Sequence, residues 1–379
     1  MYYLSKKVSL PFLAITLLIV VSLACGSGTT APTQVGQATT PPELVATSEQ
    51  AQPTTPPEPP LVPPTPTPQA VGLRRSNPYP LSELVVAPNW DVQVLEVVRG
   101  EEAWKAIQSA NQFNESAPEG MEYLLVKLHV KSTYTNSDEH SIGRGDFKVT
   151  GDRLIKYFTA SAVPPNPPLD GRLFTGGETE GWSAYLVAQG EGNLILVVDE
   201  LLNFDESHTR FIALDDGASI SVATELADIK ATDSGKERNS PAPNTEKIIT
   251  EDWEISILEI IRGDEAWNKV KESNQFNDPP AEGLEYILVR VHVRYIGTDD
   301  TAAQIDGSFF KSTGSASVLY DAPFVVEPSP MLDATLYPGG EHEGWVTVQA
   351  AKGETGVVLV FEPLFDFVGQ NKRFISLEP

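Results

Sequence analysis

Apolar and basic residues alternate one by one in two separate stretches of this chain, residues 126–131 and 289–294. Successive side chains of a β-strand point to opposite faces, so a period of two predicts a strand with one buried face and one basic face. The residues expected on the two basic faces are Lys127, His129, Lys131, Arg290, His292 and Arg294.

Other short stretches with strand-like composition surround the first of these. They are residues 90–98, 146–150, 154–159, 180–188, 193–198 and 209–214. About seven short strands with turn residues between them indicate an antiparallel β-sandwich. We therefore predict an all-β chain built from immunoglobulin-like antiparallel β-sandwiches.

One segment interrupts the strand pattern with a helical one. The sequence EEAWKAIQSAN, residues 101–111, places Trp104, Ile107 and Ala110 at helical spacing. Its first two residues are acidic, which suits a helix N-terminus. We predict a helix of about three turns, inserted after the first strand of the sandwich.

The whole pattern occurs twice along the chain. Matching residues stand 163 positions apart from the first Trp to the last Arg, without insertion or deletion. A period this long excludes a solenoid and indicates two tandem domains. We place them at residues 81–216 and 247–379, joined by a polar linker at residues 217–246. The matched pairs are Trp90 and Trp253, Trp104 and Trp267, His129 and His292, Trp182 and Trp345, and Arg210 and Arg373.

Residues 1–24 are typical of a signal peptide. Two lysines precede a hydrophobic run that contains Pro11 and is shorter than the ~20 residues of a spanning helix. The sequence VSLACG around Cys25, the only cysteine, resembles a bacterial lipobox, in which the cysteine becomes acylated. Ser22 departs from that pattern, and Ser22 with Ala24 also fits ordinary secretory cleavage, which would leave a free cysteine. We predict lipidation of Cys25, because the lone thiol lies at the cleavage point.

Residues 25–80 start with this cysteine and continue as a Pro- and Thr-rich segment, as in PPEPPLVPPTPTPQ. Such a composition cannot bury enough apolar surface to offset its ordering entropy. Pro-rich chains extend by ~3.1 Å per residue, so the segment predicts a disordered stalk. The expected location is the cell membrane, with the lipid-anchored protein facing the extracellular side or the periplasm.

The formal net charge is −25, from 52 acidic and 27 basic residues. This acidity repels phosphate backbones, so we expect no nucleic-acid partner. A solvated acidic exterior explains the charge, with cation binding or a repulsive surface coat as the alternatives. A single cysteine permits no intramolecular disulfide and no cysteine-based zinc site.

Three motifs recur in both repeats. The first copy reads NWDVQVLEVV, YLLVKLHVKS and GGETEGWSAYLV, and the second reads DWEISILEII, YILVRVHVRY and GGEHEGWVTVQA. In these motifs each repeat resembles the telokin-like, immunoglobulin-fold extracellular domain known as domain of unknown function 4352, which occurs in bacterial lipoproteins. The resemblance covers most of both repeats, implies a secreted sandwich and brings no catalytic residues. The EAW…NQFN insertion departs from shorter members of that family.

The sequence contains no motif that predicts catalysis, such as a nucleophile elbow or HExxH, and no EF-hand loop. We therefore predict a non-enzyme without a cofactor or a metal site. Weaker alternatives remain open at three places. They are calcium at Asp215 with Asp216 or Asp299 with Asp300, an anion or glycan on the basic strand faces, and binding by the Pro-rich loops at residues 163–173 and 326–336.

The helical insertion and the Asn-Gln-Phe-Asn run after it contain the candidate binding residues. One interpretation is a plug whose aromatic face closes an open end or edge of the sandwich, and the other is a binding lid. Aromatic residues at helical spacing belong to a core more often than to a site, which favours the plug. The candidates are Trp104, Asn111, Phe113, Asn114, Trp267, Asn274, Phe276 and Asn277.

We therefore expect a lipid-anchored cell-surface protein with two non-catalytic binding domains on a stalk. Its expected partners are the membrane, through the anchor, and cell-wall glycan or another surface protein. Two copies on one chain would raise avidity for a repetitive ligand. The alternative is a structural spacer of the envelope without a specific ligand.

Overall fold

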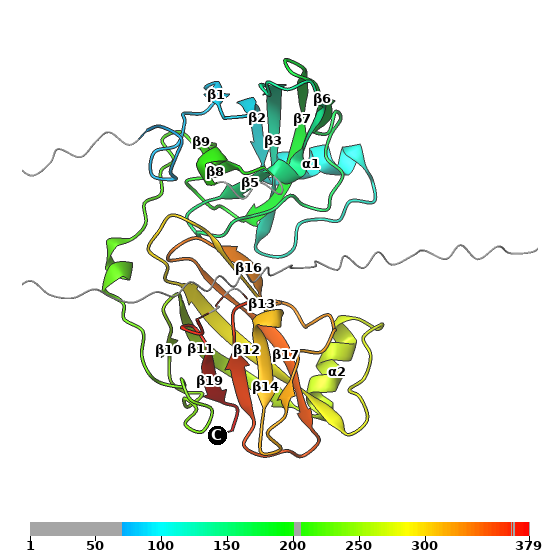
Figure 1. Ribbon diagram of the computed structural model, residues 1–379. Helices are drawn as coiled ribbons and strands as arrows, with labels where there is room; N and C mark the ends of the chain where they lie inside the picture. The colour runs from blue at the N-terminus through cyan, green and yellow to red at the C-terminus, as the bar shows by residue number, and fades with distance from the viewer. Residues whose placement is uncertain (1–69, 201–205, 365, 367, 379) are drawn as a thin grey trace, which may run out of the picture. The chain divides into compact units, whose positions relative to one another are not determined.

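Each repeat is built from two facing antiparallel sheets and a separate strand pair (Figure 1). The computed structural model describes residues 70–200, 206–364, 366 and 368–378. The predicted signal peptide, Cys25 and most of the predicted stalk lie outside these residues. Both repeats belong to one compact unit of the chain.

In the first repeat, a long sheet of strand order β1-β2-β3-β7 faces a shorter sheet of order β5-β8-β9, while β4 pairs with β6. All these pairings are antiparallel. The strands are β1 (Val85–Val86), β2 (Trp90–Arg99), β3 (Met121–Ser132), β4 (His140–Gly143), β5 (Phe147–Thr150), β6 (Asp170–Leu173), β7 (Glu178–Ala188), β8 (Ile195–Val198) and β9 (Arg210–Ala213).

The second repeat has the same plan. Its long sheet has the order β10-β11-β12-β17 and faces the sheet β15-β14-β18-β19, while β13 pairs with β16. The strands are β10 (Ile248–Ile249), β11 (Trp253–Arg262), β12 (Leu284–Tyr295), β13 (Ala303–Asp306), β14 (Phe310–Thr313), β15 (Leu319–Tyr320), β16 (Asp333–Leu336), β17 (Glu341–Ala351), β18 (Val358–Phe361) and β19 (Arg373–Ser376).

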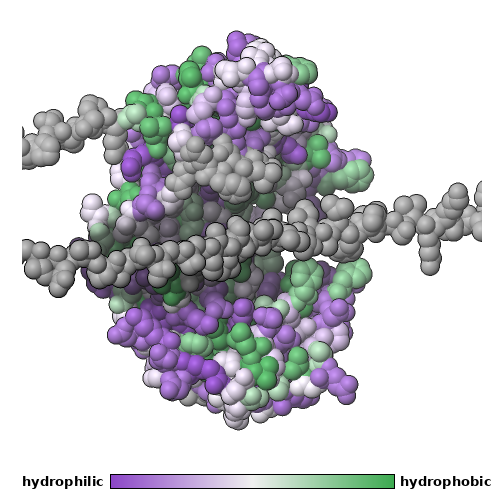
Figure 2. All heavy atoms as spheres, viewed as in Figure 1, coloured by the Kyte–Doolittle hydropathy of each residue, from purple (hydrophilic) through white to green (hydrophobic). Residues whose placement is uncertain are grey.

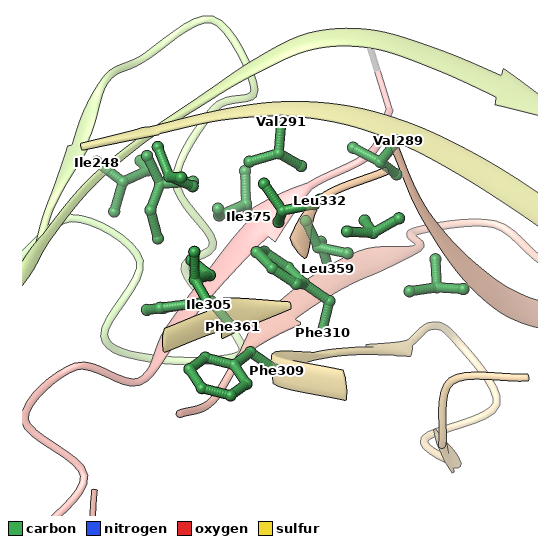
Figure 3. Close-up of a cluster of buried hydrophobic side chains, with 14 of the residues drawn as sticks. Ile248, Val289, Val291, Ile305, Phe309, Phe310, Leu332, Leu359, Phe361 and Ile375 are labelled. Atoms are coloured by element: carbon green, nitrogen blue, oxygen red, sulfur yellow. The ribbon is translucent and has the colours of Figure 1, made fainter. Parts of the chain in front are cut away.

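The alternation predicted for the two central strands is confirmed. Every valine and leucine expected on the buried faces of β3 and β12 is 0% exposed. Side chains from the facing sheets meet in one core in each repeat. Figure 3 shows part of the second core, where Val289 and Val291 of β12 converge with Phe310, Leu359 and Ile375 of the facing sheet. The all-β prediction is therefore confirmed.

The repeats share an irregularity in their long sheets as well as their strand order. The pairing of β2 with β3 shifts register at Leu95, and that of β11 with β12 shifts at Leu258. These two side chains are 40% and 49% exposed. A β-bulge inserts one unpaired residue and bends its strand, so the correspondence between the repeats extends to local backbone geometry.

The predicted helical insertion is present as α1 (Gly100–Ala110) and α2 (Asp264–Ser273). Each helix follows the long strand β2 or β11, and Figure 1 shows α2 lying beside the sheet that contains β12 and β17. In α1, the 0% exposed residues Ala103 and Ile107 face the sheet. In α2 the corresponding residues are Ala266 and Val270.

The helices cover the outer faces of the long sheets. Tyr123 and Leu125 of β3 point away from the sandwich core and pack with α1, whereas Leu124 and Val126 point into the core. Farther along β3 the same outer face becomes charged. The expectation that the helix closes an open end or edge of the sandwich is therefore wrong, because the apolar surface it covers is half of a sheet face.

One predicted strand is absent from the described first repeat. Residues 154–159 form only isolated bridges, between Val149 and Tyr157, between Ile155 and Leu336, and between Thr159 and Tyr185. The apolar residues that suggested a strand pack as single side chains against neighbouring elements. The strand pairs β4 with β6 and β13 with β16 were too short to be predicted from periodicity.

Residues 217–246 are an ordered connection that contains buried side chains. Ala218 and Ile220 pack in a cluster with Tyr337, and Ala242 belongs to the core of the second repeat. Backbone hydrogen bonds join Ile220 to the segment before β1 and Ala242 to β19. A short 3-10 helix, η3 (Thr224–Asp228), lies between these contacts; the other 3-10 helices are η1 (Arg144–Asp146), η2 (Glu206–His208) and η4 (Gly307–Phe309).

Hydrophilic residues occupy much of the molecular face drawn in Figure 2, with smaller hydrophobic areas between them. This agrees with the strongly acidic composition. Within the described part of the chain, no helix has the length and hydropathy needed to cross a membrane.

Candidate binding site: the two Asn-Gln-Phe-Asn turns

The Asn-Gln-Phe-Asn run of the first repeat forms a tight turn directly after α1. The Asn111 N–H donates to the Ile107 carbonyl (3.1 Å), which ends the helix. The Asn111 Oδ1 then accepts a hydrogen bond from the Phe113 N–H (3.0 Å). A side chain that bonds the backbone two residues on forms an Asx turn, which is a favoured role of asparagine.

Asn114 connects this turn to the Pro-rich loop between β5 and β6. Its Nδ2 donates to the carbonyls of Ile107 and Val163, both at 2.9 Å. Its Oδ1 accepts a hydrogen bond from the Val163 N–H, also at 2.9 Å. The side-chain amide therefore pairs with a peptide group in both directions, much as one strand pairs with another, and fixes the turn to the loop.

The second repeat has the same contacts. The Asn274 Oδ1 accepts from the Phe276 N–H (3.0 Å). The Asn277 Nδ2 donates to the carbonyls of Val270 (2.7 Å) and Val326 (2.8 Å), and its Oδ1 accepts from the Val326 N–H (2.8 Å). We call residues 111–114 and 274–277 the Phe turns.

Each Phe turn presents an exposed aromatic ring. Phe113 and Phe276 are both 82% exposed, although the backbone on either side is fixed by the asparagine contacts. Exposed apolar side chains begin the Pro-rich loops that the turns bind, Val163 (48%) and Val326 (43%), and Phe324 (106%) lies two residues before the second loop. A rigid turn presents its ring at little cost in conformational entropy, which is a property of binding loops.

The Pro-rich loops can reach the turns because a glycine lets each loop cross the long sheet closely. A Cβ added to Gly181 in β7 would lie 2.4 Å from the Leu169 backbone nitrogen. A Cβ added to Gly344 in β17 would lie 2.2 Å from the Leu332 nitrogen. No side chain larger than that of glycine fits this approach. The third glycine of each GGExEGW motif therefore lets the loop lie close to the sheet.

The two candidate tryptophans lie on the helices that precede the turns and are only half-buried. The Trp104 ring stacks on the Tyr123 ring with centroids 5.7 Å apart, and Trp267 meets Tyr286 at 6.1 Å. Burial, with a smaller effect from the charge of Glu115, raises the pKa of Tyr123, so the phenol stays neutral and donates to the Glu115 carbonyl (2.9 Å). Each tyrosine phenol therefore binds the residue that follows the turn, Glu115 or Asp278.

Of the four candidate residues in each repeat, three form the Phe turn and the tryptophan lies on the helix before it. The four asparagine side chains make intrachain hydrogen bonds, the tryptophans pack partly against the sheet, and the phenylalanines face solvent. Sequence reasoning singled out the Pro-rich loops separately and did not connect them to the turns. The connection depends on the amide pairing of Asn114 and Asn277, which no local sequence pattern reveals.

The basic faces of β3 and β12 are matched by acidic residues on the neighbouring strand. His129 Nε2 and Lys131 Nζ lie 3.2 and 3.1 Å from the carboxylate of Glu178 in β7. His292 lies 3.3 Å from Glu341 in β17. The Lys131 and His129 hydrogen bonds hold the pKa of Glu178 below its ordinary value. The positive charges on these two strand faces are paired with carboxylates, which argues against the alternative of an anion-binding face.

Three of the four acidic residues considered for calcium have intrachain partners. Asp300 binds Arg75, the Asp299 carboxylate accepts from the Thr301 hydroxyl (2.6 Å), and the Asp215 carboxylate accepts from the Leu194 N–H (2.9 Å). Among the residues that the structure describes, no three His, Cys, Asp or Glu side chains gather in a metal-binding arrangement.

Three solved structures are similar in part to this chain. A Bacillus subtilis protein described as a lipoprotein, ycdA, is 14% identical, with a TM-score of 0.28 over 35% of this chain and 38% of its own length. The yjhA protein of Bacillus subtilis is 12% identical, with a TM-score of 0.26 over 36% of this chain and 99% of its own. An uncharacterized β-sandwich protein from Clostridium difficile 630 is 10% identical, with a TM-score of 0.25 over 37% of this chain and 96% of its own.

This chain thus spans 38% of the length of the first of these proteins. No protein-family model matches the chain. No curated protein matches it either. The fold and the turns define the class: a tandem β-sandwich protein with one exposed Phe turn in each sandwich.

Proposed function

We propose that this protein is a non-catalytic, lipid-anchored interaction protein that contacts a partner at the cell surface through its two Phe turns. One observation carries the proposal: Phe113 and Phe276 occupy equivalent positions, are each 82% exposed, and are each held in a turn by the same asparagine contacts. An exposed aromatic ring on a hydrogen-bonded turn is a feature of binding surfaces, where aromatic residues supply much of the affinity.

The partner proposed from the sequence, cell-wall glycan or another surface protein, fits an aromatic contact. A Phe ring can pack against the apolar face of a sugar or against an apolar side chain. Two turns on one chain would act together on a repetitive or large partner. The paired charges of the outer strand faces leave the Phe turns as the favoured contact.

The test uses the full chain, purified in mild detergent, and two immobilised fractions of the cell envelope, purified glycan and extracted surface proteins. We expect wild-type protein to be retained by one fraction. The double variant Phe113→Ala/Phe276→Ala should be retained at least about 10-fold more weakly, the usual size of a loss at a binding hot spot.

The matched control is Phe174→Ala. Phe174 is 60% exposed and lies in the turn before β7. That turn bonds Ser132 at the end of β3, whereas the Phe turn precedes the start of β3. This variant should bind like the wild type. Equal retention of the wild type and the double variant, or no retention on either fraction, would contradict the proposal.

The anchor is tested separately by mass spectrometry of the mature N-terminus. A diacylglyceryl group on Cys25 would support the anchor. An unmodified Cys25 would contradict it and leave the Phe turns as the only proposed contact with the envelope.

A further inference from the structure

The surroundings of both Phe turns are acidic. Residues 100–120, which include α1 and the first turn, contain four acidic residues and one lysine, a net charge of −3. Residues 263–283, around the second turn, contain five acidic residues and two lysines, again a net charge of −3. The individual charged positions differ between the copies, while the balance and the phenylalanine are the same.

No basic residue lies in the segments that carry the exposed apolar side chains. Residues 111–120, 160–169, 274–283 and 321–332 contain neither lysine nor arginine. Their acidic residues include Glu115 and Glu119 in the first repeat and Asp278, Glu282 and Glu327 in the second. Each Phe turn is therefore an apolar tip bordered by negative charge.

We propose that each Phe turn docks a basic polypeptide segment in which lysine or arginine alternates with apolar side chains. This inference rests on the proposed function and names its partner class. An exposed Phe ring attracts a lysine or arginine cation over its face and also packs against the aliphatic stem. The bordering carboxylates attract the same cation, and an overall charge of −25 steers a basic partner toward the surface.

Other occupants fit this surface less well. A polymer rich in phosphate would be repelled by the acidic border and by the net charge of the chain. A neutral glycan would pack on the ring but would gain nothing from the carboxylates. A basic and partly apolar segment uses both features of the turn.

We expect the second turn to bind the basic segment more tightly than the first. Phe324, 106% exposed, lies two residues before the loop that binds the second turn, whereas Ser161 occupies the matching position in the first repeat. The Arg144 guanidinium contacts the Ala162 carbonyl (3.3 Å) of the first loop and adds a positive charge there, whereas the matching residue of the second repeat is Gly307.

The experiment measures binding of three fluorescein-labelled peptides to the full chain in mild detergent. The peptides are four repeats of Lys-Leu-Gly, of Ser-Leu-Gly and of Glu-Leu-Gly. We expect the lysine peptide to bind most tightly, with an affinity that falls as salt is raised from low to high concentration. Phe276→Ala should weaken it more than Phe113→Ala, and the double variant by at least about 10-fold.

Two further variants distinguish binding at the Phe turns from non-specific attraction of the peptide to the acidic surface. Glu115→Gln/Asp278→Asn should reduce the salt dependence, and the control Phe174→Ala should change nothing. Binding of the lysine peptide that is equal in the wild type and the double Phe variant would overturn the inference, because the contact would then be spread over the acidic surface. Tighter binding of the serine peptide would overturn it as well.

Failure of this inference can be distinguished from failure of the proposed function. If an envelope fraction is bound in a Phe-dependent way while the lysine peptide is not bound, the basic partner is wrong and the proposed function stands. If neither is bound, both are wrong.

Discussion

In each Phe turn the asparagines hold the backbone, and the phenylalanine presents its ring to solvent. The carbonyls of Ile107 and Val270 already accept the Asn111 and Asn274 N–H groups that end the helices. Asn114 and Asn277 each donate a second hydrogen bond to these carbonyls and use their remaining capacity to hold the Pro-rich loops. Phe113 bonds only through its backbone at the turn, and its ring stays in solvent.

The asparagine contacts should be measurable in the stability of each repeat. Asn114→Ala or Asn277→Ala removes hydrogen bonds to two backbone groups of the loop and one of the helix. We expect a loss of about 1–3 kcal/mol in the free energy of unfolding, measured by urea denaturation. The control is the exposed neighbour Gln112→Ala, with a change within about 0.5 kcal/mol. Equal effects of Asn114→Ala and Gln112→Ala would contradict the role given to Asn114.

Acid should weaken the second repeat through Glu354. Burial alone would raise the pKa of this carboxyl, but hydrogen bonds from the Ala316 and Ala351 N–H groups and the Tyr320 hydroxyl outweigh burial and hold the pKa below the ordinary 4.5. A depressed folded-state pKa contributes stability above the unfolded pKa, and this stability is lost as pH falls through the folded pKa.

Glu354→Gln removes that contribution. At pH 7 we expect a loss of about 1–3 kcal/mol. The difference between wild type and variant in urea denaturation should shrink as the pH is lowered through and below the ordinary Glu range. A difference that stays constant from pH 7 to acid would contradict the assigned hydrogen bonds.

At the scale of elements, each helix stabilises its sandwich by covering the apolar half of an outer sheet face. The fully buried side chains at this contact are small or branched: Ala103 and Ile107 in α1, Ala266 and Val270 in α2. Trp104 lies at the side of the contact, stacked on Tyr123. Helix stability of this kind comes from packing of one face.

The packing predicts an order of effects in α1. Ile107→Ala creates a cavity under the helix and should cost about 2–5 kcal/mol. Trp104→Ala removes a half-buried ring and should cost less, about 2 kcal/mol, because part of the ring is already solvated. Both are measured by urea denaturation. If Trp104→Ala were the costlier variant, the tryptophan would be the main anchor of α1 and our account of this contact would be wrong.

The strands that could be predicted from sequence are those with sustained alternation. In β3 and β12 the buried and charged faces alternate over many residues, so their sequence alone determines the face that is buried. Residues 154–159 show why short stretches mislead: Ile155 and Tyr157 pack inward without forming a ladder. The helix was predictable, but the surface it covers was not, because the outer face of β3 changes from apolar to charged partway along the strand.

For the molecule as a whole, the two repeats share strand order, bulge position, helix and Phe turn. The segment just before the first repeat also contacts the second repeat within the compact unit. Arg75, 0% exposed, donates from Nε and Nη2 to Asp300 Oδ1 (2.8 and 2.6 Å), and its guanidinium lies 3.9 Å from the centre of the Tyr337 ring. A buried cation without a partner is costly, so this contact depends on both members of the pair.

Breaking this ion pair should destabilise the chain strongly. Asp300→Ala leaves the Arg75 guanidinium buried without its carboxylate and should cost about 3–5 kcal/mol. The matched control is Asp299→Ala, which removes the exposed neighbouring carboxylate and should have little effect on the free energy of unfolding. Similar losses for both variants would show that the Arg75 contact adds nothing specific.

The central claim is that the two exposed phenylalanines make the contact with the partner. The most direct measurement is retention of the full chain on the immobilised envelope fraction that binds it, compared among the wild type, Phe113→Ala, Phe276→Ala and the double variant. The exposed rings contribute little to folding, so all four should unfold within about 0.5 kcal/mol of one another. We predict that each single variant binds more weakly and that the double variant loses at least about 10-fold in affinity. Four proteins of equal stability and equal affinity would contradict the account.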